Sequence, residues 1–155
     1  MPQDIEIKGL AELQADFKRL PGAVRKEILF AAVEDGSNII QGAEIAEAPK
    51  KTGKLAAGIT IKAGRNQTAN QASMMVGPTS PYALFVHQGT KPHEIRPKNA
   101  KALFWEGARH PVRHVKHPGT RPQPFVDQAV ASKGPEAAKR MMATIWEGIR
   151  GIMQR

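Results

Sequence analysis

Apolar residues recur at helical spacing near both ends of the chain. The first stripe, with members three or four residues apart, comprises Leu10, Leu13, Phe17 and Leu20. This spacing predicts an amphipathic helix, which Pro21 interrupts because proline lacks an N–H and clashes with the preceding turn. Helical spacing resumes at Val24 and fades before Pro49. Residues 1–48 are therefore predicted to be helical, after a short alternating strand around residues 5–7.

The middle of the chain has the pattern of short strands. Segments 58–62 and 73–77 are rich in β-branched and apolar residues, and the polar stretch 64–71 between them reads as a loop or hairpin tip. Segment 81–86 is predicted to be a short helix with Pro81 at its first position, ended by Gly89-Thr90. Gly89 is expected to take a left-handed conformation there.

Prolines dominate the next segment and then give way to a last helical stripe. Recurrent prolines from 91 to 124 exclude long helices, so short strands are expected at Glu94–Arg96 and Ala102–Trp105. One helix is expected to start at Pro124-Phe125, with Phe125 as its anchor, and another at Gly134-Pro135. The stripe then continues almost to the C-terminus through Ala138, Met141, Met142, Ile145, Ile149 and Ile152.

Helices followed by strands and then a helix predict an α+β fold. We expect a single domain over residues 1–155, with N-terminal helices, a small, mainly antiparallel β-sheet in the middle and a long C-terminal helix. In this interpretation residues 1–48 are helical, residues 55–118 are β-rich with loops, and residues 122–153 are helical.

The amino-acid composition excludes several classes of protein for this chain. The chain has no cysteine, which excludes disulfides, thiolate metal sites and a cysteine nucleophile. No apolar run approaches the roughly 20 residues of a membrane-spanning helix, and the first residues lack the pattern of a signal peptide. An unexported protein with no membrane partner is expected.

The net charge of +9 is unevenly distributed. Residues 1–48 hold five basic and nine acidic side chains, whereas residues 91–121 hold eight basic and two acidic ones. This asymmetry fits nucleic acid, an acidic surface, self-association or simply a solvated basic face. The candidate interface cations are Lys91, Arg96, Lys98, Lys101, Arg109, Arg113, Lys116 and Arg121.

Three histidines within eight residues, His110, His114 and His117, are the only candidate metal ligands, but the pattern disfavours a metal. In an extended segment His110 and His114 share one face and His117 takes the other. The nearest acid in sequence is Glu106, too far to complete a site. We therefore expect no metal and no cofactor.

Enzymatic activity is not expected either. None of the common nucleophile or phosphate-loop motifs is present, and the basic segment lacks paired carboxylates. A nucleic-acid-binding module remains the alternative: the cations could follow a phosphate backbone while Phe104 and Trp105 stack on bases. No recognised nucleic-acid-binding motif is present, and Phe104-Trp105 is more typical of a core pair on an alternating strand.

Three islands of sequence resemble one family. They are Ala48-Pro49-Lys50-Lys51-Thr52-Gly53-Lys54-Leu55, Tyr82-Ala83-Leu84-Phe85-Val86-His87-Gln88-Gly89-Thr90, and His117-Pro118-Gly119-Thr120-Arg121-Pro122-Gln123-Pro124-Phe125-Val126. Together they resemble the neck, tail-completion or minor tail-component proteins of siphophages and prophages of the HK-type lambdoid group. The family's usual acid before Gly-Thr is replaced here by His87, followed by Gln88.

The resemblance implies a structural virion protein without catalysis. It implies a homo-oligomeric, six-fold ring at the head–tail junction that touches neck, connector and tail-tube or tail-terminator proteins, passes genomic DNA with weak contact, and is assembled in the host cytoplasm. The motif residues are then structural: Pro49, Thr52, Gly53, Leu55, Tyr82, Ala83, Gly89, Thr90, His117, Pro118, Gly119, Pro124 and Phe125. Thr52 is expected to cap a helix or turn, and Gly53 to take a backbone angle that other residues avoid.

A closed ring needs two different surfaces that meet between neighbours. From the charge distribution alone, we expect the acidic N-terminal helices of one subunit to face the basic 91–121 region of the next.

Overall fold

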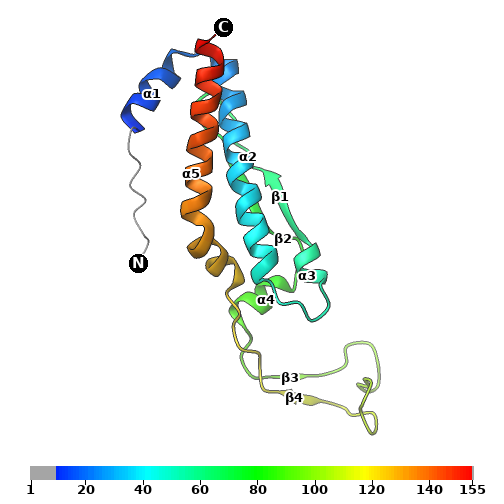
Figure 1. Cartoon of the computed structure of the whole chain (residues 1–155). Helices are drawn as coiled ribbons and strands as arrows, with labels where there is room; N and C mark the ends of the chain where they lie inside the picture. The colour runs from blue at the N-terminus through cyan, green and yellow to red at the C-terminus, as the bar shows by residue number, and fades with distance from the viewer. Residues whose placement is uncertain (1–9, 155) are drawn as a thin grey trace. The chain divides into compact units, whose positions relative to one another are not determined.

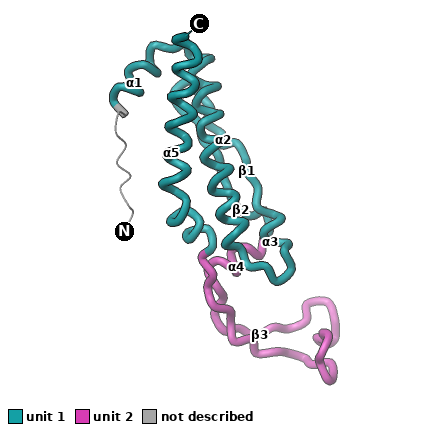
Figure 2. The backbone as a smooth tube through the Cα atoms, viewed as in Figure 1, with its two compact units in different colours: residues 1–80, 125–155 teal, residues 81–124 magenta. Residues whose placement is uncertain are grey.

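A computed structural model describes residues 10–154 of the chain, and the expected strand at residues 5–7 lies outside them. The chain divides into two compact units, one made of Met1–Ser80 with Phe125–Arg155 and the other of Pro81–Pro124 (Figure 2). Helices occur at both ends and short antiparallel strands between them, so the predicted α+β fold is confirmed.

Two long helices form the body of the first unit. They are α2 (Gly22–Glu47) and α5 (Phe125–Met153), which lie side by side (Figure 1). The first helix, α1 (Leu10–Arg19), contacts α5 and buries Leu13. The predicted interruption is confirmed, because Pro21 stands in extended conformation directly before α2.

A β-hairpin packs on another face of α2. Its strands are β1 (Ile59–Ala63) and β2 (Met74–Pro78), paired antiparallel, and each lies one residue later than predicted. The Gln41 side chain on α2 donates a hydrogen bond of 2.9 Å to the carbonyl oxygen of Ile59. The short helix α3 (Lys54–Ala57), which the sequence pattern did not predict, leads into β1. Thus α2 is covered by α5 on one side and by the hairpin on another.

The helix start predicted at Gly134-Pro135 is wrong. Helix α5 runs through this point without a break, with Pro135 in its interior. An interior proline costs about 3 kcal/mol, because it removes one hydrogen bond and crowds the preceding turn. Ala129 and Ala137 are both buried, one on each side of Pro135. Burial along the whole helix outweighs the local cost, so the helix continues.

Two glycines let α2 and α5 approach closely. A Cβ atom added to Gly36 would lie 2.6 Å from Cγ of Met141, and one added to Gly148 would lie 2.8 Å from Cγ1 of Ile28. Gly42, also on α2, has no atom within 4 Å of that position. A glycine inside a helix can serve close packing or a kink, and of Gly36 and Gly42 only Gly36 is required for close packing.

Replacing Gly36 with valine should lower the free energy of unfolding by about 1–3 kcal/mol, because the new side chain overlaps Met141. Gly42→Val is the matched control on the same helix and should be neutral or slightly stabilising. Denaturant unfolding of both variants measures the difference. Equal losses in the two variants would show that Gly36 has no special packing role.

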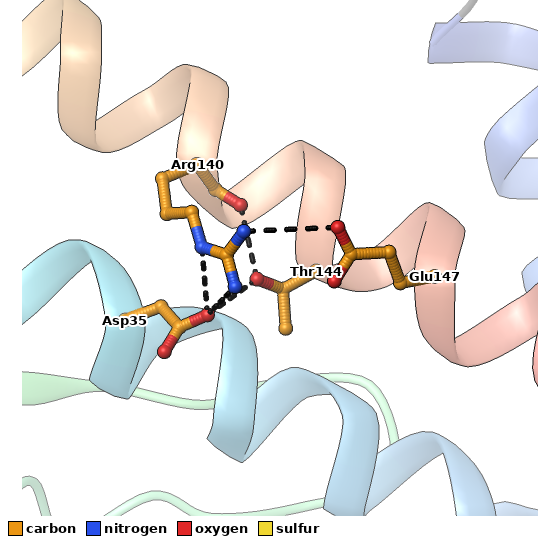
Figure 3. A network of polar contacts seen from close by, with 4 residues as sticks. All are labelled: Asp35, Arg140, Thr144 and Glu147. Atoms are coloured by element: carbon orange, nitrogen blue, oxygen red, sulfur yellow. Dashed lines mark hydrogen bonds and ion pairs between the residues drawn. The ribbon is translucent and has the colours of Figure 1, made fainter.

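A polar cluster joins the same two helices at their surface (Figure 3). One carboxylate oxygen of Asp35 on α2 accepts hydrogen bonds from the Thr144 hydroxyl at 2.6 Å and from Nε of Arg140 at 3.0 Å. Arg140 also lies 3.7 Å from the carboxylate of Glu147. The Thr144 hydrogen bond, aided by the guanidinium of Arg140, holds the pKa of Asp35 below its ordinary value.

This lowered pKa predicts a pH dependence of stability. The folded state favours the charged Asp35, so its contribution is present above the pKa of the unfolded chain and is lost as pH falls through the folded pKa. The Asp35 side chain is 34% exposed, so we expect a contribution of only about 1 kcal/mol.

Asp35→Asn should therefore be less stable than the wild type at pH 7, and the difference should shrink toward pH 3. Unfolding curves at both pH values measure this. Glu47→Gln removes an exposed carboxylate from the same helix and is the control. A difference for Asp35→Asn that is the same at pH 7 and pH 3 would contradict the charge-based account.

Candidate functional site

The second unit contains a pair of Gly-Thr dipeptides that meet side by side. We call Gly89-Thr90 together with Gly119-Thr120 the clasp. The two threonines exchange both backbone N–H···O hydrogen bonds, each 3.1 Å long, and their hydroxyl oxygens lie 3.1 Å apart. Two of the three sequence islands are therefore in direct contact, although about 30 residues separate them along the chain.

Only glycine fits beside the threonines of the clasp. Gly89 and Gly119 have φ values of 71° and 85°, a region that other residues rarely adopt. A Cβ on Gly89 would lie 2.5 Å from the carbonyl oxygen of Thr120, and a Cβ on Gly119 would overlap that of Thr90. The left-handed conformation predicted for Gly89 is confirmed for φ only. Its ψ of −177° lies outside the left-handed helical region and directs the chain into the extended pair.

The short helix that precedes the clasp is α4 (Ala83–Gln88). It begins two residues later than Pro81, with Tyr82 at the N-cap, so the predicted proline start is wrong. The chain returns past α4 after the clasp, where the backbone N–H of Gln123 donates a hydrogen bond of 3.0 Å to the carbonyl oxygen of Val86. Ala83 is buried, whereas Tyr82 is 42% exposed.

Between the two halves of the clasp runs a two-stranded ribbon, residues 91–118, which we call the arm. Its strands are β3 (His93–Ile95) and β4 (Val115–His117), paired antiparallel with Glu94 opposite Lys116. The strand predicted at Glu94–Arg96 is therefore confirmed with a shift of one residue. No residue from 84 to 124 is buried. The arm accordingly has no hydrophobic core of its own.

The strand predicted at Ala102–Trp105 is wrong. Only Leu103 pairs there, through two backbone hydrogen bonds with Val112 of 2.7 and 3.0 Å. A turn follows at once, closed by a 2.9 Å hydrogen bond from the N–H of Ala108 to the carbonyl oxygen of Trp105, and it leaves no room for a longer strand. We call residues 101–113 the tip of the arm.

The expectation that Phe104 and Trp105 are core residues is also wrong. Phe104 is 68% exposed and Trp105 is 50% exposed. They lie where the chain turns back at the tip, so no other segment of the second unit covers them. Large exposed aromatic residues are uncommon on a surface that contacts only water, and they are enriched at interfaces.

All eight candidate interface cations lie in or beside the arm, and all are exposed. Arg96 forms an ion pair with Glu94 at 2.7 Å. Among the described residues, the other seven form no ion pair: Lys91, Lys98, Lys101, Arg109, Arg113, Lys116 and Arg121. The predicted basic surface thus exists, and most of its charge is available to a partner.

The histidines are split between different surroundings. The rings of His93 and His117 lie 5.0 Å apart across the strand pair, and Nδ1 of His117 accepts a 3.1 Å hydrogen bond from the N–H of Gly119. Nε2 of His114 lies 3.6 Å from Glu94. The expectation that no carboxylate lies near these histidines is wrong, because pairing of β3 with β4 brings Glu94 close to His114. Among residues 10–154, no three potential metal ligands cluster.

The remaining motif residues lie in the first unit or at its boundary. Gly53 occupies the N-cap of α3 and has a φ of 69°. The unusual backbone angle predicted for it is therefore confirmed. Thr52 does not cap α3, since no side chain caps that helix, so that expectation is wrong. Leu55 and Phe125 are 4% and 1% exposed, so Phe125 is buried at the start of α5, as an anchor there must be.

Comparison with known proteins gives one match. Residues 11–89, about half of the chain, match the family model described as "Bacteriophage HK97-gp10, putative tail-component". Neither the curated proteins nor the solved structures contain a match. No helix of the described part of the chain is long and apolar enough to cross a membrane.

Proposed function

Since the chain belongs to the HK97-gp10-like family of bacteriophage tail components, we propose that it forms a homo-oligomeric ring at the head–tail junction and joins the tail to the capsid connector. Its role is structural, and its mechanism is assembly. The ring has six subunits and touches neck, connector and tail-tube or tail-terminator proteins.

The observation that supports this role best is the uncovered arm. A two-stranded ribbon is at most marginally stable alone in water and needs packing against something else. The arm has no buried residue, and it exposes two aromatic side chains and six cations that form no ion pair among the described residues. Such a segment is expected to gain its packing from another subunit.

A ring also requires that two different surfaces of the protomer meet. The arm supplies one surface, and helix α2 of the first unit supplies the other. Helix α2 carries exposed acids, including Glu27 and Glu34, that form no ion pair within the described chain. The two surfaces therefore differ in charge, as expected from the sequence.

Phage particles made without this protein test the role directly. We expect tailless capsids beside free tails in electron micrographs, and supply of the wild-type protein from a plasmid should restore tailed particles. Complete, infectious tailed particles formed without the protein would overturn the proposal.

The unpaired cations of the arm also favour a second candidate function, binding of nucleic acid. This function predicts tight binding of duplex DNA that weakens steeply as salt rises. A ring that only lets DNA pass predicts weak binding, since a tight grip would hinder ejection. A gel-shift titration at two salt concentrations distinguishes the two functions.

A further inference from the structure

The outward face of α2 presents an aromatic residue between two acids. Glu27, Phe30 and Glu34 follow at spacings of three and four residues, so they lie on one face of the helix. Phe30 is 36% exposed, and both glutamates are exposed without an ion pair among the described residues. We call these three residues the acidic patch.

The tip of the arm presents the complementary arrangement. Two exposed aromatic residues, Phe104 and Trp105, lie in the tip, and the exposed cations Lys101 and Arg109 flank them in sequence. The Leu103–Val112 pair holds the ends of this short loop together. The tip also holds one exposed acid, Glu106, but three cations outnumber it, so the tip combines net positive charge with apolar area. The acidic patch combines net negative charge with apolar area.

We propose that the tip of one copy docks on the acidic patch of α2 in a second copy. Lys101 and Arg109 would then face Glu27 and Glu34, while Trp105 and Phe104 cover Phe30. Aromatic side chains supply contact area and cations can also lie over an aromatic face, so both kinds of residue favour this pairing. The inference rests on the proposed ring, and it names the contact that closes it.

The outer face of the hairpin is a less suitable partner for the tip. It has a shallow hollow of about 240 Å³ lined by Thr60, Lys62 and Met75, among others. Met75 is 63% exposed there and offers apolar area. Lys62 would meet the cations of the tip, however, and like charges disfavour a contact. The face of the acidic patch also carries one exposed cation, Lys26, but its two acids outnumber it, so charge complementarity still favours the patch over the hairpin.

Charge reversal tests the contact. Glu27→Lys with Glu34→Lys, or Lys101→Glu with Arg109→Glu, should each weaken self-association by roughly tenfold or more, because like charges then face each other. All four substitutions together should restore it. Lys50→Glu with Lys51→Glu reverses two exposed cations elsewhere and is the control. Thermal unfolding of each variant checks that the exposed substitutions leave the fold intact.

The outcomes separate this contact from the ring itself. If wild type assembles and the reversals have no effect, or if the fourfold variant fails to recover, the docking is wrong and the ring stands. If wild type remains monomeric under all conditions, the proposed function fails and the docking fails with it.

The absence of cysteine allows a second, independent test. Ala31→Cys beside the acidic patch and Glu106→Cys at the tip should be linked between copies by a flexible bismaleimide. A head-to-tail contact gives a ladder longer than a dimer, whereas either cysteine alone gives dimers at most. The proposal would be overturned if the double variant gave no ladder, or if the reagent linked only the two cysteines within one copy.

Discussion

Replacing Gly119 with alanine is expected to open the clasp. The added Cβ would overlap the carbonyl oxygen of Thr90 and would lie 3.0 Å from the carbonyl carbon of Lys91. Alanine at a φ of 85° also costs about 1–2 kcal/mol before any clash. Both effects act on the backbone pair that joins Thr90 to Thr120, so that pair should separate.

Hydrogen exchange measures this opening. In Gly119→Ala the amide protons of Thr90 and Thr120 should exchange at least about tenfold faster than in wild type, because their partners are displaced. Gly53→Ala is the matched control, since Gly53 also has positive φ but no atom within 4 Å of an added Cβ. Unchanged exchange at both threonines in Gly119→Ala would show that the clasp tolerates a side chain.

Replacing Phe125 with alanine should cause the largest loss of stability, about 3–5 kcal/mol in the free energy of unfolding. Phe125 is 1% exposed and is one of the largest fully buried side chains. Its removal deletes apolar contacts and leaves a cavity at the start of α5. Denaturant unfolding followed by circular dichroism measures the loss.

Val130 provides the control for this experiment. It lies on the same helix but is 51% exposed, so Val130→Ala should change the free energy of unfolding by no more than about 0.5 kcal/mol. A Phe125→Ala variant as stable as Val130→Ala would mean that Phe125 does not anchor α5.

The spacing of apolar residues along the chain predicted the elements in which the local pattern and the burial agree. The bounds of α1 and α2 follow from apolar spacing and from Pro21, and β1 and β2 lie within one residue of the prediction. The break expected at Pro135 failed for a physical reason. The prediction considered only the local effect of Pro135. Buried residues on both sides of this proline keep the helix continuous.

The arm could be predicted only in part. Its charge and its prolines are visible in the sequence, but the exposure of Phe104 and Trp105 depends on a turn that follows them immediately. The contact between Glu94 and His114 depends on the register of β3 with β4, which the sequence pattern did not specify.

Sequence islands identified the residues of the clasp without showing that they touch. Gly89-Thr90 is predicted as the end of a short helix, and Gly119-Thr120 belongs to a separate island of sequence. Their mutual hydrogen bonds appear only when the chain is folded. The signal that could have joined them is the repeated Gly-Thr dipeptide at the two ends of a proline-rich segment.

The proposed ring, in which subunits of this tail component meet through the arm, has a mass that can be measured in solution. The purified protein is measured at low salt and at about 1 M salt, where the Debye length is near 3 Å. We predict a closed oligomer of six subunits at low salt that dissociates toward monomer at high salt. A protein that stays monomeric at low salt would contradict the ring, and an oligomer unchanged at high salt would contradict a contact based on charge.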